Sequence, residues 1–176
     1  TGTAEVKLND CIASDDDVVG EVNRGWKIIM HTLDVGRVAI SGVAVGIARG
    51  AYEEALNWAR NREVFGKKLA EMQNAQFELA EMVAGIETAR TLAYYAAYLY
   101  DTKSPNFLLM SHVAKLQSAR LAVDVTRRAV QMEGGFGYSK ESKAEMFYRD
   151  AKILEIGEGT NEIMKYVIYK LLERSL

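Results

Sequence analysis

The sequence has 176 residues, of which 49% are hydrophobic and 26% charged, a composition that suits a globular protein with one main domain. Its 22 Lys and Arg residues against 24 Asp and Glu residues give a net charge of -2. This balance excludes a broad cationic surface for nucleic acid or for an anionic membrane. The single cysteine, Cys11, excludes an internal disulfide and a cysteine metal cluster, and we expect it to be a small buried side chain.

The N-terminal segment from Thr3 to Asn9 alternates polar and apolar residues, which is the period of a half-buried β-strand. A lone strand is not stable, so we expect this strand to belong to a β-domain that precedes it. We therefore divide the chain into residues 1–22, a remnant of that β-domain with a linker, and residues 23–176, a helical domain. The longest uncharged run, Val38 to Ala48, is much shorter than the roughly 20 residues of a membrane span, so none is expected.

Four long helices are predicted in the remainder, which contains one proline, Pro105, at a junction between two of them. The second helix has small or apolar residues at alternating spacings of three and four, as in a bundle seam. Short links between long amphipathic helices favour a mainly α fold, an antiparallel four-helix bundle. The predicted helices and their inward residues are Val35–Arg62; the second helix with Leu79, Met82, Ile86, Ala89, Ala93, Ala96 and Tyr100; Phe107–Gln131 with Val113, Leu116, Ala119, Val123 and Val130; and Asn161–Glu173 with Ile163, Val167 and Leu171.

The two histidines decide whether such a bundle could hold a di-iron site, because that site needs Glu-x-x-His pairs on two helices. His31 is preceded at three residues by Ile28, and His112 by Leu109. Neither histidine completes the motif, so we expect no metal site and interpret both as surface or hydrogen-bonded packing residues.

One carboxylate, Glu158, lies between Gly157 and Gly159 in a segment that joins two helical patterns. The glycines allow a sharp turn and the close approach of a ligand. Thr160 or Asn161 is a suitable N-cap for the last helix, whose backbone N–H groups could face a polar ligand. From spacing alone, the segment is either such a ligand-binding turn or a simple helix entry whose acids complement the helix dipole.

Two further turns carry weaker signals. The segment from Gln131 to Tyr138 ends a helix with three glycines, which can bring backbone amides against a phosphate or a ring, or can simply cap the helix. The segment from Arg62 to Gly66 is a helix end with a cationic residue favourable to the helix dipole. Each turn alone is compatible with a purely structural role.

Taken together and in this order, the segments resemble the acyl-CoA dehydrogenase family over essentially the whole chain. The resemblance is carried by Asp34-Val35-Gly36-Arg37, by Arg62-x-x-Phe65-Gly66 with Gln73, by Gln131 to Gly137, by Arg149-Asp150-Ala151-Lys152, and by Glu158-Gly159-Thr160-x-Glu162-Ile163. The family fold has a helical domain, a middle β-domain and a C-terminal four-helix bundle, so the chain looks like the C-terminal portion only.

The resemblance implies an FAD-dependent α,β-dehydrogenation of acyl-CoA thioesters to trans-2-enoyl-CoA, as in fatty acid β-oxidation. Glu158 would abstract the α-proton while the flavin accepts the β-hydrogen as hydride. The residues implied to bind acyl-CoA are Asp34, Arg37 and Gly159. Those implied to contact FAD are Arg62, Phe65, Gln73, Gln131, Gly134 and Gly135, toward the cofactor of a neighbouring subunit, and Thr160 and Glu162, toward the cofactor of their own site.

The same resemblance implies a homodimer or homotetramer, an electron-transferring flavoprotein as acceptor, and a cytoplasmic (prokaryotic) or mitochondrial matrix location. Two positions depart from the family pattern. Gly157 stands where many members carry tyrosine, so we expect a roomier pocket. Some members place their base directly before the matching arginine, but this position is Gly36 here, which has no side chain. The resemblance therefore leaves Glu158 as the expected base.

Two alternatives are carried forward: a non-catalytic helical oligomerisation or binding module, and an acyl-CoA oxidase-like flavoenzyme. Bundle motifs alone do not set reactivity toward oxygen. We also expect the isolated 176 residues to bind FAD poorly and to be inactive, because in the family the β-domain covers one face of the flavin.

Overall fold

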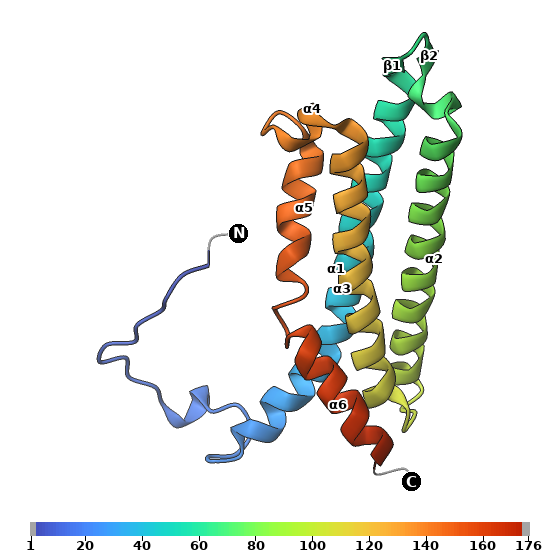
Figure 1. Ribbon diagram of the computed structural model, residues 1–176. Coiled ribbons are helices and arrows are strands. Elements are labelled where there is room, and N and C mark those ends of the chain that lie inside the picture. The colour runs from blue at the N-terminus through green and yellow to red at the C-terminus, as the bar shows by residue number, and fades with distance from the viewer. Residues whose placement is uncertain (1–2, 174–176) are drawn as a thin grey trace.

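The fold is a bundle of long antiparallel helices, in a computed structural model that describes residues 3–173. Three long helices and the shorter α5 run side by side, and α6 crosses one end of the bundle (Figure 1). This confirms the predicted mainly α architecture. The helices are α1 (Gly25–Asn61), α2 (Gln73–Asp101), α3 (Phe107–Glu133), α4 (Gly135–Tyr138), α5 (Lys143–Ile153) and α6 (Asn161–Glu173).

The helix boundaries differ from the prediction in two places. α1 begins at Gly25 rather than Val35, because nothing in the intervening sequence interrupts a helix. α5 was not predicted, although its inward residues Ala144, Phe147, Ala151 and Leu154 follow a helical spacing. The fourth helix of the bundle is therefore α5, and the predicted fourth helix, α6, is an additional one.

The core is built mainly from small side chains, with α3 in contact with α1, α2, α5 and α6. Small residues let helix backbones approach closely, and the cluster is extended by larger side chains from α2. The buried residues are Ala44, Ala48, Ala51, Ala55 and Ala59 on α1; Leu79, Met82, Ile86, Ala89, Ala96 and Leu99 on α2; and Ala114, Leu116, Ala119, Ala122, Val125 and Ala129 on α3. The predicted α2 seam is confirmed except at Ala93, which is half-buried, and at its end, where Tyr100 is exposed and Leu99 is buried.

The inward face of α6 differs from the predicted stripe at its first position. Met164 is fully buried, whereas the predicted Ile163 is 48% exposed. The other two predicted residues, Val167 and Leu171, are half-buried, because α6 crosses the end of α3 (Figure 1) and is covered along one side.

The segment from Thr3 to Asn9 forms no strand in the part of the chain that the structure describes, and its residues are exposed. A strand requires a partner for its backbone groups, and residues 3–173 offer none beside it. Cys11 is also exposed, contrary to the expectation of a buried side chain, because this extended segment packs against no other element. The predictions for Thr1 and Gly2 lie outside the described residues.

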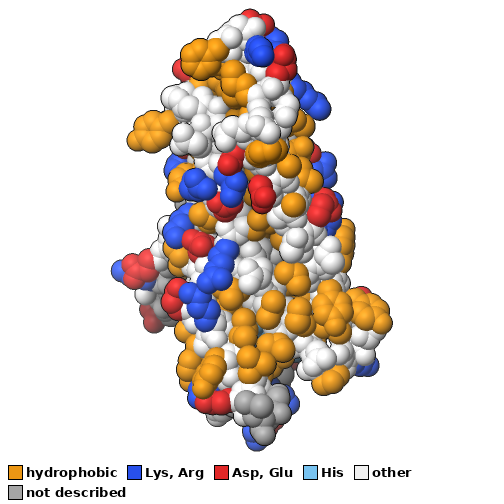
Figure 2. Space-filling view, turned by 45° about the vertical axis from the view of Figure 1, so that its right-hand side comes forward, with side chains coloured by type: hydrophobic (Ala, Val, Ile, Leu, Met, Phe, Trp, Pro, Cys, Tyr) orange, Lys and Arg blue, Asp and Glu red, His pale blue; other side chains and the backbone are white. Residues whose placement is uncertain are grey.

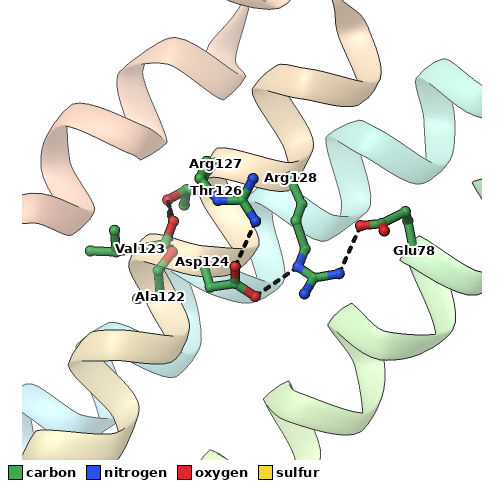
Figure 3. Close-up of polar contacts among 7 residues, drawn as sticks. All are labelled: Glu78, Ala122, Val123, Asp124, Thr126, Arg127 and Arg128. Carbon is green, nitrogen blue, oxygen red and sulfur yellow. Dashed lines mark hydrogen bonds and ion pairs between the residues drawn. The ribbon is translucent and has the colours of Figure 1, made fainter.

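A charge network ties the beginning of α2 to the last turns of α3 (Figure 3). The Arg128 guanidinium donates to Glu78 on α2 and to Asp124 on α3, each at 2.7 Å, and Arg127 donates to Asp124 at 2.9 Å. These groups are partly exposed, so each pair contributes only about 0 to 1 kcal/mol. The network fixes the relative position of the helices more than it stabilises them.

Much apolar surface remains uncovered on the described chain. Figure 2 shows hydrophobic side chains gathered at both ends of one face, with charged residues between them. The exposed aromatic residues include Trp26 on α1, Tyr94, Tyr95, Tyr98 and Tyr100 on α2, and Tyr166 and Tyr169 on α6. α1 is long and apolar enough, by length and composition alone, to cross a membrane; core helices of soluble proteins meet the same criterion, and its alanine stripe is buried.

The connection between α1 and α2 contains a tight hairpin. β1 (Glu63–Val64) pairs with β2 (Lys67–Lys68) antiparallel, with Glu63 opposite Lys68 and Val64 opposite Lys67. The two central residues, Phe65 and Gly66, have φ values of 53° and 76°, as a type I′ turn requires. The turn projects the Phe65 side chain into solvent, where it is 95% exposed.

Candidate active site

The turn between α5 and α6 holds Glu158 in a backbone conformation that non-glycine residues rarely adopt. Its φ is 55°, and that of the following Gly159 is 96°. A non-glycine residue in the left-handed region costs of order 1 to 3 kcal/mol, so the surroundings must hold it there. Two backbone hydrogen bonds close the turn, from Gly157 N–H to the Ile153 carbonyl (2.7 Å) and from Asn161 N–H to the Glu155 carbonyl (3.0 Å).

Arg37 of α1 reaches this turn from a buried position. Its guanidinium pairs with Asp34 at 2.5 Å, and its Nε donates to the Glu158 carbonyl at 3.3 Å. The side chains of Arg37 and Asp34 are 4% and 18% exposed. The structure thus brings together Asp34, Arg37, Glu158 and Gly159, which are the four residues expected to bind and transform the substrate.

Lys115 of α3 also reaches the turn, and the sequence analysis did not identify it. Its side chain is completely buried, and its Nζ donates to the Gly159 carbonyl at 2.5 Å. Burial lowers the pKa of Lys115, and nearby Arg37 lowers it further, against the opposing effect of Glu155, Glu158 and Glu162. The sequence does contain a sign of it: Lys115 lies on the same face of α3 as the buried residues. A charged residue at such a position needs a partner, because charged side chains are rarely buried without one.

The Glu158 carboxylate faces the backbone of α1 at Gly36. A Cβ atom placed on Gly36 would lie 2.8 Å from Glu158 Oε2, so only glycine leaves this oxygen unhindered. Oε2 is buried, and among residues 3–173 it has no hydrogen-bond partner. A buried carboxylate oxygen without a donor is costly, and it is well suited to accept a proton from a bound molecule.

His112 lies one turn before Lys115 and is 2% exposed. Its Nδ1 lies 2.7 Å from the Leu108 carbonyl, and since a carbonyl only accepts, we assign the ring proton to Nδ1. Burial lowers the pKa of His112, which favours the neutral ring. The interpretation as a hydrogen-bonded packing residue fits this position. Within the described residues, no group of three or more His, Cys, Asp or Glu side chains could hold a metal.

The remaining predicted residues are divided between the two ends of the bundle (Figure 1). Arg62 lies in the hairpin connection with its guanidinium 5.9 Å from the centre of the Trp58 ring. Trp58 stacks on Phe136 of α4, with ring centroids 4.9 Å apart and planes 7° from parallel. These contacts join the hairpin to the glycine-rich end of α3, at the opposite end from Glu158.

A pocket of about 410 Å³ opens between α2 and α3 at the hairpin end. Gln131 lines it together with apolar residues on both sides of the start of α2 and with the charged Glu78, Arg127 and Arg128. Gln73 is not among the lining residues but lies in sequence between two of them, Met72 and Asn74. Gly134 and Gly135 are exposed, and no atom lies within 4 Å of a Cβ built on either. The hairpin end of the bundle therefore presents an open backbone, an amide side chain and the exposed Arg62 and Phe65.

Thr160 and Glu162 begin α6 beside the Glu158 turn. Thr160 Oγ1 accepts from the Ile163 N–H at 3.2 Å and so satisfies a free donor at the helix N-terminus. Glu162 is exposed and pairs with Lys165 at 3.5 Å. Both residues lie at the start of α6, close to Glu158 in sequence, and α6 crosses the end of the bundle opposite the hairpin (Figure 1).

Residues 23–172 match the family described as acyl-CoA dehydrogenase, C-terminal domain. The chain is 43% identical over 175 residues to the mitochondrial short-chain specific acyl-CoA dehydrogenase of Rattus norvegicus, which covers 99% of this chain and 42% of that protein. The solved butyryl-CoA dehydrogenase of Megasphaera elsdenii superimposes with a TM-score of 0.84 at 42% identity, covering 87% of this chain and 40% of that one.

A chain from a structure of the electron transferring flavoprotein of Acidaminococcus fermentans superimposes with a TM-score of 0.90 at 39% identity. The match covers 94% of this chain and 43% of that one. The chain thus spans less than half the length of each of these proteins.

Proposed function

Because the chain belongs to the acyl-CoA dehydrogenase family, we propose that it is the C-terminal part of an FAD-dependent enzyme that converts acyl-CoA thioesters to trans-2-enoyl-CoA. In this proposal, residues 1–22 end a β-domain and residues 23–176 form the helical domain. The observation that supports it most directly is the buried, unpartnered Oε2 of Glu158, held against Gly36.

Glu158 acts as the base that removes the α-proton of the thioester. Its left-handed backbone turns the carboxylate toward α1, and Arg37 holds its carbonyl while Asp34 neutralises the buried guanidinium. Bound FAD supplies the acceptor for the β-hydrogen as hydride. Placing one base in a fixed, water-poor position is how a carboxylate becomes effective toward a weak carbon acid.

The hairpin end fits an extended, phosphate-bearing cofactor such as FAD. The exposed Arg62 guanidinium offers a planar set of donors for a pyrophosphate, and Gln131 offers both a donor and an acceptor. The open backbone at Gly134 and Gly135 allows close approach, and the exposed Phe65 ring gains a partner when a ligand covers it.

We further propose that each FAD lies between two copies of the chain, since the two groups of residues occupy opposite ends of one bundle. Thr160 and Glu162 then contact the FAD of their own site, while the hairpin end contacts the FAD of a neighbouring copy. This requires a homodimer or homotetramer, and the exposed aromatic residues provide apolar surface for such contacts. The residues of the hairpin group are Arg62, Phe65, Gln73, Gln131, Gly134 and Gly135.

An electron-transferring flavoprotein is the proposed acceptor of the electrons, supported by the similarity to a chain from the Acidaminococcus fermentans structure. The compartment is proposed to be the cytoplasm in a prokaryote or the mitochondrial matrix in a eukaryote, following the mitochondrial relative from rat.

The test is the visible absorbance of the complete, FAD-loaded protein mixed anaerobically with short, branched and long acyl-CoAs. We expect at least one acyl-CoA to bleach the flavin. Gly157 leaves space beside the turn, where an added Cβ meets only the Ile153 carbonyl at 3.4 Å, so Gly157→Tyr should slow the branched and bulkier thioesters first. If FAD binds and no acyl-CoA bleaches it, the proposed substrate class is wrong. Reoxidation by oxygen instead of the flavoprotein would identify an oxidase.

Gly36→Ala tests whether the position of the Glu158 carboxylate matters. The new Cβ would lie 2.8 Å from Oε2, so the carboxylate must move. Because a displacement of about 1 Å can cost 10²-fold, we expect bleaching to slow by roughly 10-fold or more. The helix should gain up to about 1 kcal/mol from the same change. Gly42→Ala is the matched control on α1: no atom lies within 4 Å of its Cβ, so it should change the rate little. Equal rates for both variants would contradict the assigned geometry.

A further inference from the structure

Lys115 is the one lysine in residues 3–173 whose side chain is buried. It lies on the central helix α3, between residues that pack in the core, and its ammonium group reaches out of that core to the turn between α5 and α6. Placing a cation in this position is unfavourable unless the cation has a partner. Its hydrogen-bond partner is the main-chain carbonyl of Gly159, at 2.5 Å.

The main-chain carbonyl groups of Glu158 and Gly159 both accept hydrogen bonds from buried cationic side chains. Arg37 of α1 donates to the Glu158 carbonyl at 3.3 Å, and Lys115 of α3 donates to the next carbonyl along. Both residues of the turn have positive φ values, 55° and 96°. Two helices far apart in sequence thus fix consecutive peptide groups in a conformation that the turn would not keep by itself.

The direction of the Glu158 side chain follows from these two contacts. A left-handed residue projects its side chain differently from an extended or helical one, and here the carboxylate is directed at Gly36. If the Gly159 carbonyl were released, the Gly159–Thr160 peptide group could rotate, the positive φ at Gly159 would no longer be held, and the Glu158 carboxylate could move away from α1. The Arg37 guanidinium has its charge partner in Asp34. Without Lys115, the turn would keep only the long hydrogen bond of 3.3 Å from Arg37 to the Glu158 carbonyl.

We propose that Lys115 is a positioning residue, whose ammonium group holds the Gly159 carbonyl so that the Glu158 carboxylate stays directed at the substrate side of α1. This inference rests on the proposed role of Glu158 as the base. Lys115 itself contacts no reacting atom, and its effect on the rate passes through Glu158.

The test is a double-mutant cycle in the complete, FAD-loaded protein, with the rate of anaerobic bleaching by the best acyl-CoA as the readout. The four proteins are the wild type, Lys115→Met, Glu158→Gln and the double variant. Methionine keeps the length and apolar stem of lysine but cannot donate. We expect Lys115→Met to slow bleaching by roughly 10-fold or more, with the half-saturating acyl-CoA concentration changed less than about threefold. In the Glu158→Gln background the same substitution should change the rate less than about threefold, because the base it positions is gone.

Flavin content and thermal midpoint are measured for every protein, and Gln117→Met is the matched control on the exposed face of α3. Lys115→Gln, which retains an N–H donor on a shorter side chain, is carried through the same cycle. It should fall between wild type and Lys115→Met, and it decides the question if the methionine variant does not assemble.

An equal loss in both backgrounds would mean that Lys115 only supports the fold, and an unchanged rate in Lys115→Met would mean that the contact has no effect on the base. Either result overturns the inference while leaving Glu158 in place. If Glu158→Gln itself bleaches like wild type, the failure lies with the proposed function.

Discussion

Glu158→Gln is expected to slow anaerobic bleaching of the complete, FAD-loaded protein by about 10² or more, which is the scale of losing a general base. Glutamine has the size of glutamate and can occupy the same place against Gly36, but it cannot take up the α-proton. Since the backbone contacts of the turn from Arg37 and Lys115 go to carbonyl groups, they are retained in the variant. Stopped-flow absorbance at saturating acyl-CoA measures the effect.

The matched control is Glu155→Gln, three residues earlier in the same turn. Glu155 Oε1 accepts from the Asn161 side chain at 3.0 Å, and the amide oxygen of glutamine can take over this role. We expect the control to stay within about threefold of the wild-type rate. Bleaching of Glu158→Gln at the wild-type rate would reduce Glu158 to a turn residue and favour the non-catalytic alternative.

Arg37→Met should produce the largest loss of stability, about 3 to 5 kcal/mol, because it breaks a buried ion pair and leaves the Asp34 carboxylate without a counter-charge. The Arg37 side chain is 4% exposed and that of Asp34 is 18% exposed, so water can compensate little of the loss. It also frees the Glu158 carbonyl. Hydrogen exchange of the α1 amides in the complete protein measures the local opening free energy without assuming a two-state transition.

Arg49→Met is the matched control on the same helix. Arg49 pairs with Glu53 at 2.7 Å, but the two side chains are 63% and 56% exposed, so the expected loss is about 0 to 1 kcal/mol. Adding Asp34→Asn to Arg37→Met should recover part of the loss by removing the unpaired charge. Equal losses at Arg37 and Arg49 would show that burial of the first pair has no energetic importance.

The helices with long apolar stripes were predictable from periodicity, because a bundle seam repeats every three or four residues whatever covers it. α2 illustrates this; on α3, Leu116 and Ala119 are buried as predicted, whereas Val113, Val123 and Val130 are half-buried beside the alanines that form the core. α5 was missed because its 11 residues form only about three turns, too few repeats for an apolar stripe to stand out. The first buried residue of α6 is Met164 and not the predicted Ile163, because the angle at which a helix crosses a bundle is set by its partners and not by its own sequence.

The candidate site was predictable only in part. Asp34, Arg37, Glu158 and Gly159 were grouped through the family resemblance, and no spacing rule connects residues 121 positions apart such as Arg37 and Glu158. Lys115 was not predicted because its partner is a main-chain carbonyl, which every residue carries and which no sequence pattern identifies. Cys11 and the segment from Thr3 to Asn9 were misjudged for a related reason, since burial and strand pairing depend on elements that residues 3–173 do not provide.

The contacts of α1 and α3 with the Glu158 turn also affect the order in which the chain can fold during synthesis. Arg37 and Lys115 leave the ribosome 121 and 44 residues before the carbonyl groups they bind. Before those carbonyl groups are synthesised, α1 and α3 can pack against each other through their alanines, while the side chains of Arg37 and Lys115 remain hydrated. Within residues 3–173, the Glu158 turn therefore gains these contacts after α1, α2 and α3 have been synthesised, and the helices can pack before the proposed base is in place.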